Sequence, residues 1–283
     1  MNYRHAFHAG NFADVHKHAV LAHILRYLHG KPAAFRVIDT HAGAGRYDLL
    51  AAEACRSGEW RGGIGRVYAA PRQSPHAFLT PYLDVVAAFN PDGTLRTYPG
   101  SPLIARSLLR TQDRLIACEA EPHAAAALAA SLRGDRRAKA LAIDGWTALG
   151  AFLPPKERRG LVLIDPPFEQ ADEFTRLAGA VAAAHRKWPT GIYMLWYPMT
   201  ERAGPVAPAA LARRLQRLSI ANVLRCELTV GSPRGQGGMV GSGLIVVNPP
   251  FTLEPDLRTL MPALSRMLSP AAASRIDWLA EPQ

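Results

Sequence analysis

The chain has 283 residues, of which 48 % are hydrophobic, and this is enough for one substantial α/β core. Its 33 Lys and Arg outweigh 23 Asp and Glu, giving a net charge of +10, and most of the cations are Arg. Guanidinium groups bind phosphate bidentately, so this balance favours an anionic polymer as partner, although an Arg-rich genome would leave the same composition. No apolar run reaches the roughly 18 residues of a membrane span, which excludes a membrane protein.

Two further features predict a cytoplasmic protein. Cys55, Cys118 and Cys226 are odd in number, far apart and without metal-type spacing, as is usual in a reducing compartment. Arg4 and Asp14 lie where a signal peptide would need an uncharged apolar core. We therefore expect no export.

The first predicted element is a helix over residues 11–29. Apolar residues recur there at helical spacing, Asn11 is a suitable N-cap and Gly30 follows the end. Four histidines lie before and within its first half: His5, His8, His16 and His18. They form no HExxH motif or Cys/His pair, so we expect no metal site. Two alternatives remain for the opening segment, a solvated surface or an arm that faces substrate or cofactor.

The next segment changes period. FRVID at 35–39 predicts a short strand, and the glycine-rich THAGAG directly after it predicts a tight turn followed by a helix. Residues 48–98 break the alternation and contain one stretch of helical character, PYLDVVAAF. We interpret 48–98 as a small helical subdomain inserted into a single domain that spans 1–283.

Alternation resumes after residue 98. Helices are predicted at SPLIARSLL, PHAAAALAASL, GWTALGAFL, residues 171–187 and PAALARRLQRL, and strands at RLIACE, AKALAID, LVLIDPP, GIYMLWYP, RCELTV and GLIVVN. Seven strands separated mainly by helices predict an α/β, Rossmann-like, largely parallel sheet. The last two strands are joined by a loop with no room for a helix, so they should form an antiparallel hairpin. We expect residues 252–283 to be a short terminal extension.

Acids and glycines follow four successive predicted strands. They are Asp39 with His41 and Gly43, then Glu119, then Asp144 with Gly145, and then Asp165. Ligands of open parallel sheets bind at these carboxyl ends, where a carboxylate can accept ribose hydroxyls. HAGAG lacks the third glycine of GxGxxG, and the acids would repel a pyrophosphate, which argues against a nicotinamide dinucleotide. S-adenosylmethionine fits better, because it is cationic and carries no phosphate.

The fourth strand ends in Asp165-Pro166-Pro167-Phe168, a motif suited to an adenine amino group. The N6 lone pair is delocalised into the ring, so N6 is a poor nucleophile until acceptors hold its hydrogens. The Asp165 carboxylate and the Pro166 carbonyl can do this, because two prolines turn the backbone rigidly. Phe168 offers a stacking face, worth about 1–3 kcal/mol per base. Positioning alone can remove roughly 7–11 kcal/mol of barrier, so no metal is required.

A near copy, GLIVVNPPF, follows at 243–251 and raises the question of which motif is catalytic. Chemistry alone does not decide, since an Asn248 side chain also accepts hydrogen bonds. Topology does. Asp165 ends a parallel strand beside the cofactor strands, whereas an antiparallel last strand carries Asn248 to the opposite end of the sheet. We therefore predict that Asp165 is catalytic, that Asn248 is structural and that Phe251 covers apolar surface.

Several segments together resemble a known family. NYRHAFHAGNFADVHKH, IDTHAGAGRY, YPGSPLIA, DGW, RRGLVLIDPPF, LWYP and SGLIVVNPP are similar to the bacterial 23S ribosomal RNA adenine N6-methyltransferases of the RlmJ type. The resemblance covers almost the whole chain. It departs at Phe168, where the family usually has Tyr, so stacking survives while a hydroxyl contact is lost. The stretch 48–98 is the least matched part.

The resemblance implies residue roles and partners. Asp165 would be the catalytic acid, and Tyr3 and His5 would face the target adenine. The cofactor site would be lined by Lys17, His18, His41, Gly43, Ser101, Glu119, Asp144, Gly145 and Asp165. The substrate would be one adenine of 23S ribosomal RNA, bound before full ribosome assembly by a monomeric cytoplasmic enzyme.

Two other functions stay open from the residues. A DNA adenine methyltransferase shares DPPF but usually carries an extra target-recognition domain, which is not evident here. A non-catalytic RNA-binding protein of the same fold would not need the four strand-end acids. The basic helix with Arg213, Arg214 and Arg217 is either a surface that binds RNA or a solvated helix face.

Overall fold

The computed structural model describes residues 4–70, 78–170, 172–201, 206–217, 220–231 and 238–281. Eight strands form one sheet in the order β10-β8-β9-β7-β6-β1-β4-β5. Their bounds are β1 Arg36–Asp39, β4 Arg114–Cys118, β5 Ala138–Leu141, β6 Gly160–Ile164, β7 Ile192–Thr200, β8 Val223–Thr229, β9 Met239–Val247 and β10 Ala273–Ala280. The predicted α/β, Rossmann-like class is confirmed.

The parallel half of the sheet fixes where a ligand can bind. β1 pairs in parallel with β4 on one side and with β6 on the other, β4 pairs with β5, and β6 pairs with β7. The chain thus leaves β1 toward one edge and returns to build the other half from β6. Ligand crevices of open sheets form at such a switch point, outside the carboxyl ends of the strands.

The other half is antiparallel. β8 and β9 form the predicted hairpin, and β9 runs antiparallel to β7. The sheet has eight strands rather than seven, because β10 adds to β8 at the edge. The prediction of a short terminal extension was therefore wrong: this segment also holds α11, Leu253–Leu268. Its buried leucines recur at helical spacing, at 253, 257, 260, 264 and 268, a pattern that the sequence analysis passed over.

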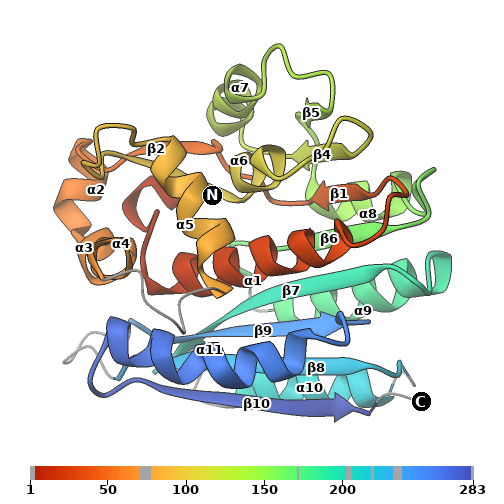
Figure 1. Cartoon of the computed structure of the whole chain (residues 1–283). Coiled ribbons are helices and arrows are strands. Elements are labelled where there is room, and N and C mark those ends of the chain that lie inside the picture. The colour runs from red at the N-terminus through yellow and green to blue at the C-terminus, as the bar shows by residue number, and fades with distance from the viewer. Residues whose placement is uncertain are drawn as a thin grey trace.

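Helices cover both faces of the sheet, as Figure 1 shows for α1 and α11 in front and α9 and α10 behind. One face carries α1 Phe12–Leu28, α6 Ser101–Ser107 and α11, and the other carries α8 Gly145–Ala151, α9 Glu173–Lys187 and α10 Val206–Arg217. α7, Pro122–Ser131, lies beside β5. The predicted N-cap of α1 is confirmed, because the Asn11 side chain accepts hydrogen bonds from the N–H groups of Ala13 and Asp14. No helix in the described ranges is long and apolar enough to cross a bilayer.

Residues 48–98, here called the insertion, begin and end in two short paired strands, β2 Arg46–Asp48 and β3 Thr97–Pro99. β2, and not the predicted helix, follows the THAGAG turn, because the chain leaves the main sheet at this point. The insertion contains α2 Ala52–Ser57, α3 Glu59–Gly62, α4 Ile64–Ala69 and α5 Thr80–Ala88. Ile64 and Tyr82 are buried in the same core as α1. Whether 48–98 acts as a separate subdomain stays a prediction.

The residues before α1 form a short arm, here defined as residues 4–11. It begins with a 3₁₀ turn, η1, at His5–Phe7. Gly10 then turns the chain into the helix with a φ of +77°. A Cβ at Gly10 would approach the Ile64 side chain to 2.8 Å, so the arm lies directly against the insertion.

Candidate active site

One pocket of about 1440 Å³ gathers the predicted site residues at the carboxyl ends of β1, β4, β5 and β6. Its lining includes His5, Lys17, His18, His41, Gly43, Ser101, Glu119, Asp144, Gly145, Asp165, Pro166, Pro167 and Phe168. Tyr3 lies outside the described residues. The structure thus brings together residues that are up to 163 positions apart, from His5 to Phe168, although it does not test their individual roles.

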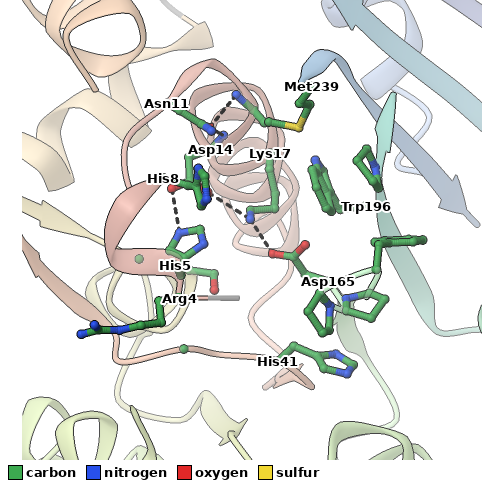
Figure 2. Close-up of a pocket in the computed structure, with 18 of the residues that line it drawn as sticks. Arg4, His5, His8, Asn11, Asp14, Lys17, His41, Asp165, Trp196 and Met239 are labelled. Atoms are coloured by element: carbon green, nitrogen blue, oxygen red, sulfur yellow. Dashed lines mark hydrogen bonds and ion pairs between the residues drawn. The ribbon is translucent and has the colours of Figure 1, made fainter. Parts of the chain in front are cut away.

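Lys17 links the first helix to the DPPF motif. Its ammonium lies 2.5 Å from Asp165 Oδ2 and 3.0 Å from Asp14 Oδ1, and Figure 2 shows it pointing from α1 toward Asp165. All three side chains are largely buried, with exposed fractions of 5 %, 15 % and 2 % for Lys17, Asp165 and Asp14. A buried charge is stable only when it is paired, so the three groups depend on one another.

Asp14 is a site residue that the sequence analysis missed. Its second oxygen is 3.0 Å from His5 Nε2 and accepts a 2.9 Å hydrogen bond from the Gly10 N–H. Burial by itself would raise the pKa of Asp14, but the positive charges of His5 and Lys17 hold it well below its ordinary value. The spacing of one helical turn between Asp14 and Lys17 was visible in the sequence as a possible ion pair.

Asp39, the last residue of β1, is compensated less completely. It is 1 % exposed, and neither carboxylate oxygen has a hydrogen-bond partner in the described part of the chain. Burial raises the pKa of Asp39 to about 7, and the charge of Asp165 acts in the same direction. The Ser101 side chain, the charge of Lys17 and the main chain of His41 oppose this rise only in part. Asp39 is not among the residues that line the described pocket, but Thr40 and His41, which follow it directly, are.

Close backbone approaches shape the floor of the pocket. A Cβ at Gly145 would lie 2.1 Å from the Thr40 carbonyl oxygen, and one at Gly43, where φ is +61°, would lie 2.3 Å from the Tyr47 hydroxyl. Both positions therefore require glycine. The N–H of Gly43 donates to Glu119 Oε2 at 2.8 Å, which fixes that carboxylate at the carboxyl end of β4.

His41 is held in one tautomer. The Thr40 hydroxyl donates to the Leu163 carbonyl, so the 2.7 Å contact between Thr40 Oγ1 and His41 Nδ1 requires the proton on Nδ1. Burial lowers the pKa of His41 to about 4, which leaves Nε2 as a neutral acceptor. Its ring meets Trp146 edge-on, with centroids 5.2 Å apart.

The comparisons with known proteins agree on one family. A family model described as ribosomal RNA large subunit methyltransferase D, RlmJ, matches residues 32–280. The ribosomal RNA large subunit methyltransferase J of Escherichia coli K12 is 41 % identical over 281 residues, which cover 99 % of each chain. The enzyme of the same name from Haemophilus influenzae is 38 % identical over 282 residues, again covering 99 % of each chain.

This chain belongs to the RlmJ family. A crystal structure of a Legionella pneumophila protein also superposes with a TM-score of 0.86 at 33 % identity, covering 96 % of this chain and 98 % of that one. The chain is accordingly a methyltransferase with S-adenosylmethionine as its cofactor, and the resemblance inferred from its motifs is confirmed.

The pocket of this RlmJ-family protein suits that cofactor chemically. S-adenosylmethionine carries ammonium and sulfonium charges, ribose hydroxyls and an adenine amino group, and no phosphate. The pocket offers carboxylate acceptors in Glu119, Asp144 and Asp165, and the buried Asp39 directly precedes two further lining residues, Thr40 and His41. Gly43 and Gly145 also line the pocket, and neither carries a side chain that could exclude a ligand. The donor set therefore fits a cationic, phosphate-free ligand.

Asp144 and its neighbours form the outer wall. Asp144 Oδ2 caps α8 by accepting the Thr147 N–H at 3.1 Å, which leaves the other oxygen available to a ligand. The Arg176 guanidinium lies over the Trp146 ring at 4.8 Å. This part of the pocket combines an aromatic edge with a carboxylate.

A cluster of aromatic rings surrounds the end of DPPF. Phe168, with φ of +52°, contacts Phe174 at 4.8 Å and Trp196 at 5.8 Å between ring centroids. Trp196 also lies 5.4 Å from the Lys17 ammonium and donates from Nε1 to Ser242 Oγ at 2.9 Å. The sequence analysis did not identify Trp196, because a single Trp in a strand gives no signal of the wall it joins.

Two of the four histidines at the start of the chain, His16 and His18, are buried and neutral. Burial lowers the pKa of His16 and of His18 to about 3. His16 Nδ1 of α1 lies 3.0 Å from Ser242 Oγ of β9, and His18 Nδ1 lies 2.7 Å from the hydroxyl of the buried Tyr98. Within the described ranges no group of three or more His, Cys, Asp or Glu is arranged to hold a metal.

The second motif lies at the other end of the sheet, as topology predicted. Val247 of β9 pairs with Tyr193 at the start of β7, so Asn248 follows at the amino ends of the parallel strands. The Asn248 side chain donates to the carbonyls of Pro189 and Gly191 at 2.7 and 2.8 Å. Phe251 does not cover apolar surface as expected: it is 82 % exposed and meets only one ring, that of Tyr27, edge-on among the described aromatic contacts.

Proposed function

We propose that this protein methylates the N6 atom of one adenine in 23S ribosomal RNA and that Asp165 is its catalytic residue. The observation that carries the proposal is the location of Asp165-Pro166-Pro167-Phe168 after β6, at the switch point of the sheet and inside the cofactor pocket. When bound, S-adenosylmethionine supplies an activated methyl group on its sulfonium sulfur. The protein's own part is to seat the adenine and to hold its amino group in line.

Asp165 and the Pro166 carbonyl accept the two N6 hydrogens in this proposal. Holding both hydrogens favours a more tetrahedral nitrogen, whose lone pair is directed out of the ring. Asp165 Oδ2 is engaged by Lys17, so Oδ1 is the oxygen that meets the amino group. Lys17 thus acts as a positioning residue that fixes the carboxylate, while Asp14 holds Lys17 from the other side.

The adenine ring packs against Phe168 and its aromatic neighbours. Stacking of a base on an aromatic side chain is worth about 1–3 kcal/mol and tolerates Phe in place of Tyr. In this proposal His5, fixed by Asp14, closes over the base from the arm, and Tyr3, which precedes the arm in the sequence, contributes to the same contact. An adenine in folded RNA has to leave its stack to reach such a pocket.

The cofactor is held by residues around the strand ends. Glu119 accepts the ribose hydroxyls, Asp144 and Gly145 meet the adenine moiety, and Asp39 with Ser101 lies toward the charged amino-acid end. Lys17, His18, His41 and Gly43 complete the lining. Asp39 is buried directly before Thr40 and His41 of this lining, so in this proposal its charge favours the cationic ligand without direct contact.

The choice of RNA rests on the relatives. Both curated relatives are named as methyltransferases of large subunit ribosomal RNA and align over 99 % of this chain. We further expect a monomeric cytoplasmic enzyme that acts before full ribosome assembly, with residues 48–98 as an inserted subdomain.

Incubation with radiolabelled cofactor tests the proposal directly. Protein-free 23S ribosomal RNA, 16S ribosomal RNA and duplex DNA containing adenine are offered separately, and the labelled nucleoside is identified by mass spectrometry. We expect N6-methyladenosine in 23S RNA alone. Label in DNA would support the DNA enzyme instead, and RNA binding without any label would support the non-catalytic alternative.

A further inference from the structure

The arm is gripped by the first helices of the insertion through two acidic side chains. The Arg4 guanidinium bonds Glu53 of α2 at 2.8 Å. Glu59 of α3 contacts His8 Nδ1 at 3.1 Å and accepts from Asn11 Nδ2 at 3.0 Å. Glu59 therefore binds the middle of the arm and its junction with α1 at the same time.

Main-chain contacts add to this grip. The Ile64 N–H donates to the Gly10 carbonyl at 2.8 Å, and the Ser57 hydroxyl donates to the Phe7 carbonyl. A Cβ at Gly63 would lie 2.2 Å from the Gly10 oxygen, so the two backbones are in direct contact. These contacts span both ends of the arm, and their partners all lie between residues 53 and 64.

The Glu59 contacts are charged. The hydrogen bond that His8 Nδ1 donates to the Glu59 carboxylate raises the pKa of His8 above its ordinary value, although burial opposes the change. Burial would raise the pKa of Glu59, but the hydrogen bonds of His8 and Asn11 lower it below its ordinary value. Each partner thus favours the charged form of the other, and charge-assisted hydrogen bonds are stronger than neutral ones.

The contacts of Glu59 with the arm are connected to the reaction pocket through Asn11 and Asp14. Asn11 caps α1, and its side-chain oxygen accepts the N–H of Asp14 at 3.0 Å. Asp14 in turn holds His5 and Lys17. Figure 2 shows His8, His5 and Asn11 grouped around Asp14 at the start of α1. A movement of the arm would therefore displace His5 relative to Asp165.

We propose that Glu59 is a positioning residue for the target adenine, acting through His8 and Asn11 to hold the arm over the pocket. The inference rests on the proposed function, because it assigns the arm to the adenine side of that site. The proposal also assigns a role to the insertion, because its helices hold the short N-terminal arm in place. A misplacement of about 1 Å at a reacting group can reduce turnover about 100-fold.

Three variants of the full chain test the proposal. Glu59→Ala removes both contacts, and Glu59→Gln keeps the shape while losing the charge. Asp92→Ala is the matched control, because it removes an acid from the same insertion whose carboxylate bonds only its own turn, at Thr94 and Arg96, among the described contacts. The readouts are kcat and KM with protein-free 23S RNA, the Kd of the cofactor by calorimetry, and hydrogen exchange of the amides of residues 5–14.

We expect Glu59→Ala to speed exchange in the arm and to lower kcat/KM for RNA about 10- to 100-fold, with cofactor Kd changed less than about twofold. Glu59→Gln should lie between Glu59→Ala and the unsubstituted protein, and Asp92→Ala should match the latter. Unchanged hydrogen exchange of the arm amides in Glu59→Ala would refute the claim that Glu59 holds the arm in place. Faster exchange with full turnover would overturn the role of the arm at the adenine. If the unsubstituted protein does not methylate adenine, the proposed function is refuted. Hydrogen exchange does not depend on methylation, so the two failures can be distinguished.

Discussion

The Lys17 ammonium lies 2.5 Å from Asp165 Oδ2 and joins the first helix of the chain to the end of β6, 148 residues later. The contact assigns one oxygen of Asp165 to the protein and leaves the other for a ligand. No equivalent cation meets Asn248, whose side chain donates to two main-chain carbonyls in the described structure. Asp165 therefore presents a hydrogen-bond acceptor in the pocket, whereas the Asn248 side chain donates its hydrogens to the main chain.

The first prediction compares the two motifs directly. Asp165→Ala should reduce methyl transfer about 100- to 1,000-fold, because it removes a preorganised acceptor at the reacting group. Asn248→Ala should retain turnover and lose about 1–3 kcal/mol of unfolding free energy, since it leaves two carbonyls unpaired. Single-turnover kinetics and urea unfolding measure the two effects. A folded Asn248 variant that binds cofactor and RNA yet is inactive would reverse the assignment.

The second prediction concerns the residues proposed to cover the adenine. Tyr3→Ala and His5→Ala should each lower methylation of 23S RNA while leaving cofactor affinity nearly unchanged, because they act on the base and not on the methyl donor. His5→Ala should also lower stability, since His5 is an ion-pair partner of the buried Asp14. Turnover and calorimetric Kd separate the two effects. An equal loss of cofactor binding in Tyr3→Ala would place the arm at the cofactor.

The third prediction uses the unpartnered carboxylate of Asp39. Its pKa in the folded chain, about 7, lies above the ordinary value of 3.8, so between these values the folded state holds a proton that the unfolded state releases. Its contribution to stability is present below pH 3.8 and is lost as the pH rises through about 7. Asp39→Asn removes this loss and should be more stable than the unsubstituted protein by a few kcal/mol near pH 8, with little difference near pH 4.

Urea unfolding at several pH values, with the exposed Asp92→Asn as control, measures this difference. The same Asp39→Asn substitution should weaken cofactor binding, because the neutral amide lacks the charge that a cationic ligand favours. A variant with lower stability at pH 8, or with unchanged cofactor affinity, would contradict the interpretation of Asp39 as a buried charge that favours the cationic cofactor.

The fourth prediction concerns RNA affinity and salt. With a net charge of +10, binding to 23S RNA should weaken steeply as salt increases, because released counterions supply much of the affinity. Arg213 and Arg217 on α10 are exposed, and neither lines the pocket. If they bind phosphate, the double substitution to Ala should reduce the slope of log K against log salt by about 1 per contact.

Filter binding at a series of salt concentrations measures the slope. The charge-matched control replaces Arg133 and Arg136, which are exposed before β5 at the opposite edge of the sheet. Equal slopes for both double variants would make α10 a solvated helix face. An affinity that stays flat with salt would remove the electrostatic argument as a whole.

The sequence by itself determined the alternation of the main sheet and the residues at its strand ends. Strand and helix periodicities are local properties, so β1, β4, β6 and the cap at Asn11 could be predicted within a few residues. The carboxyl ends of parallel strands lie at the same end of the sheet. Glu119 and Asp165 could therefore be assigned to one pocket before their distance was known. The antiparallel pairing that carries Asn248 away also followed from the length of one loop.

Only the tertiary structure decided which side chains meet across these elements. The contact of Glu59 with the arm, the ion pair of Lys17 with Asp165 and the pairing of β10 with β8 join residues 44 to 148 positions apart. Such contacts depend on how whole helices pack, which local periodicity does not encode. The isolation of buried Asp39 is likewise a property of its surroundings, because the same residue type is fully paired at position 14.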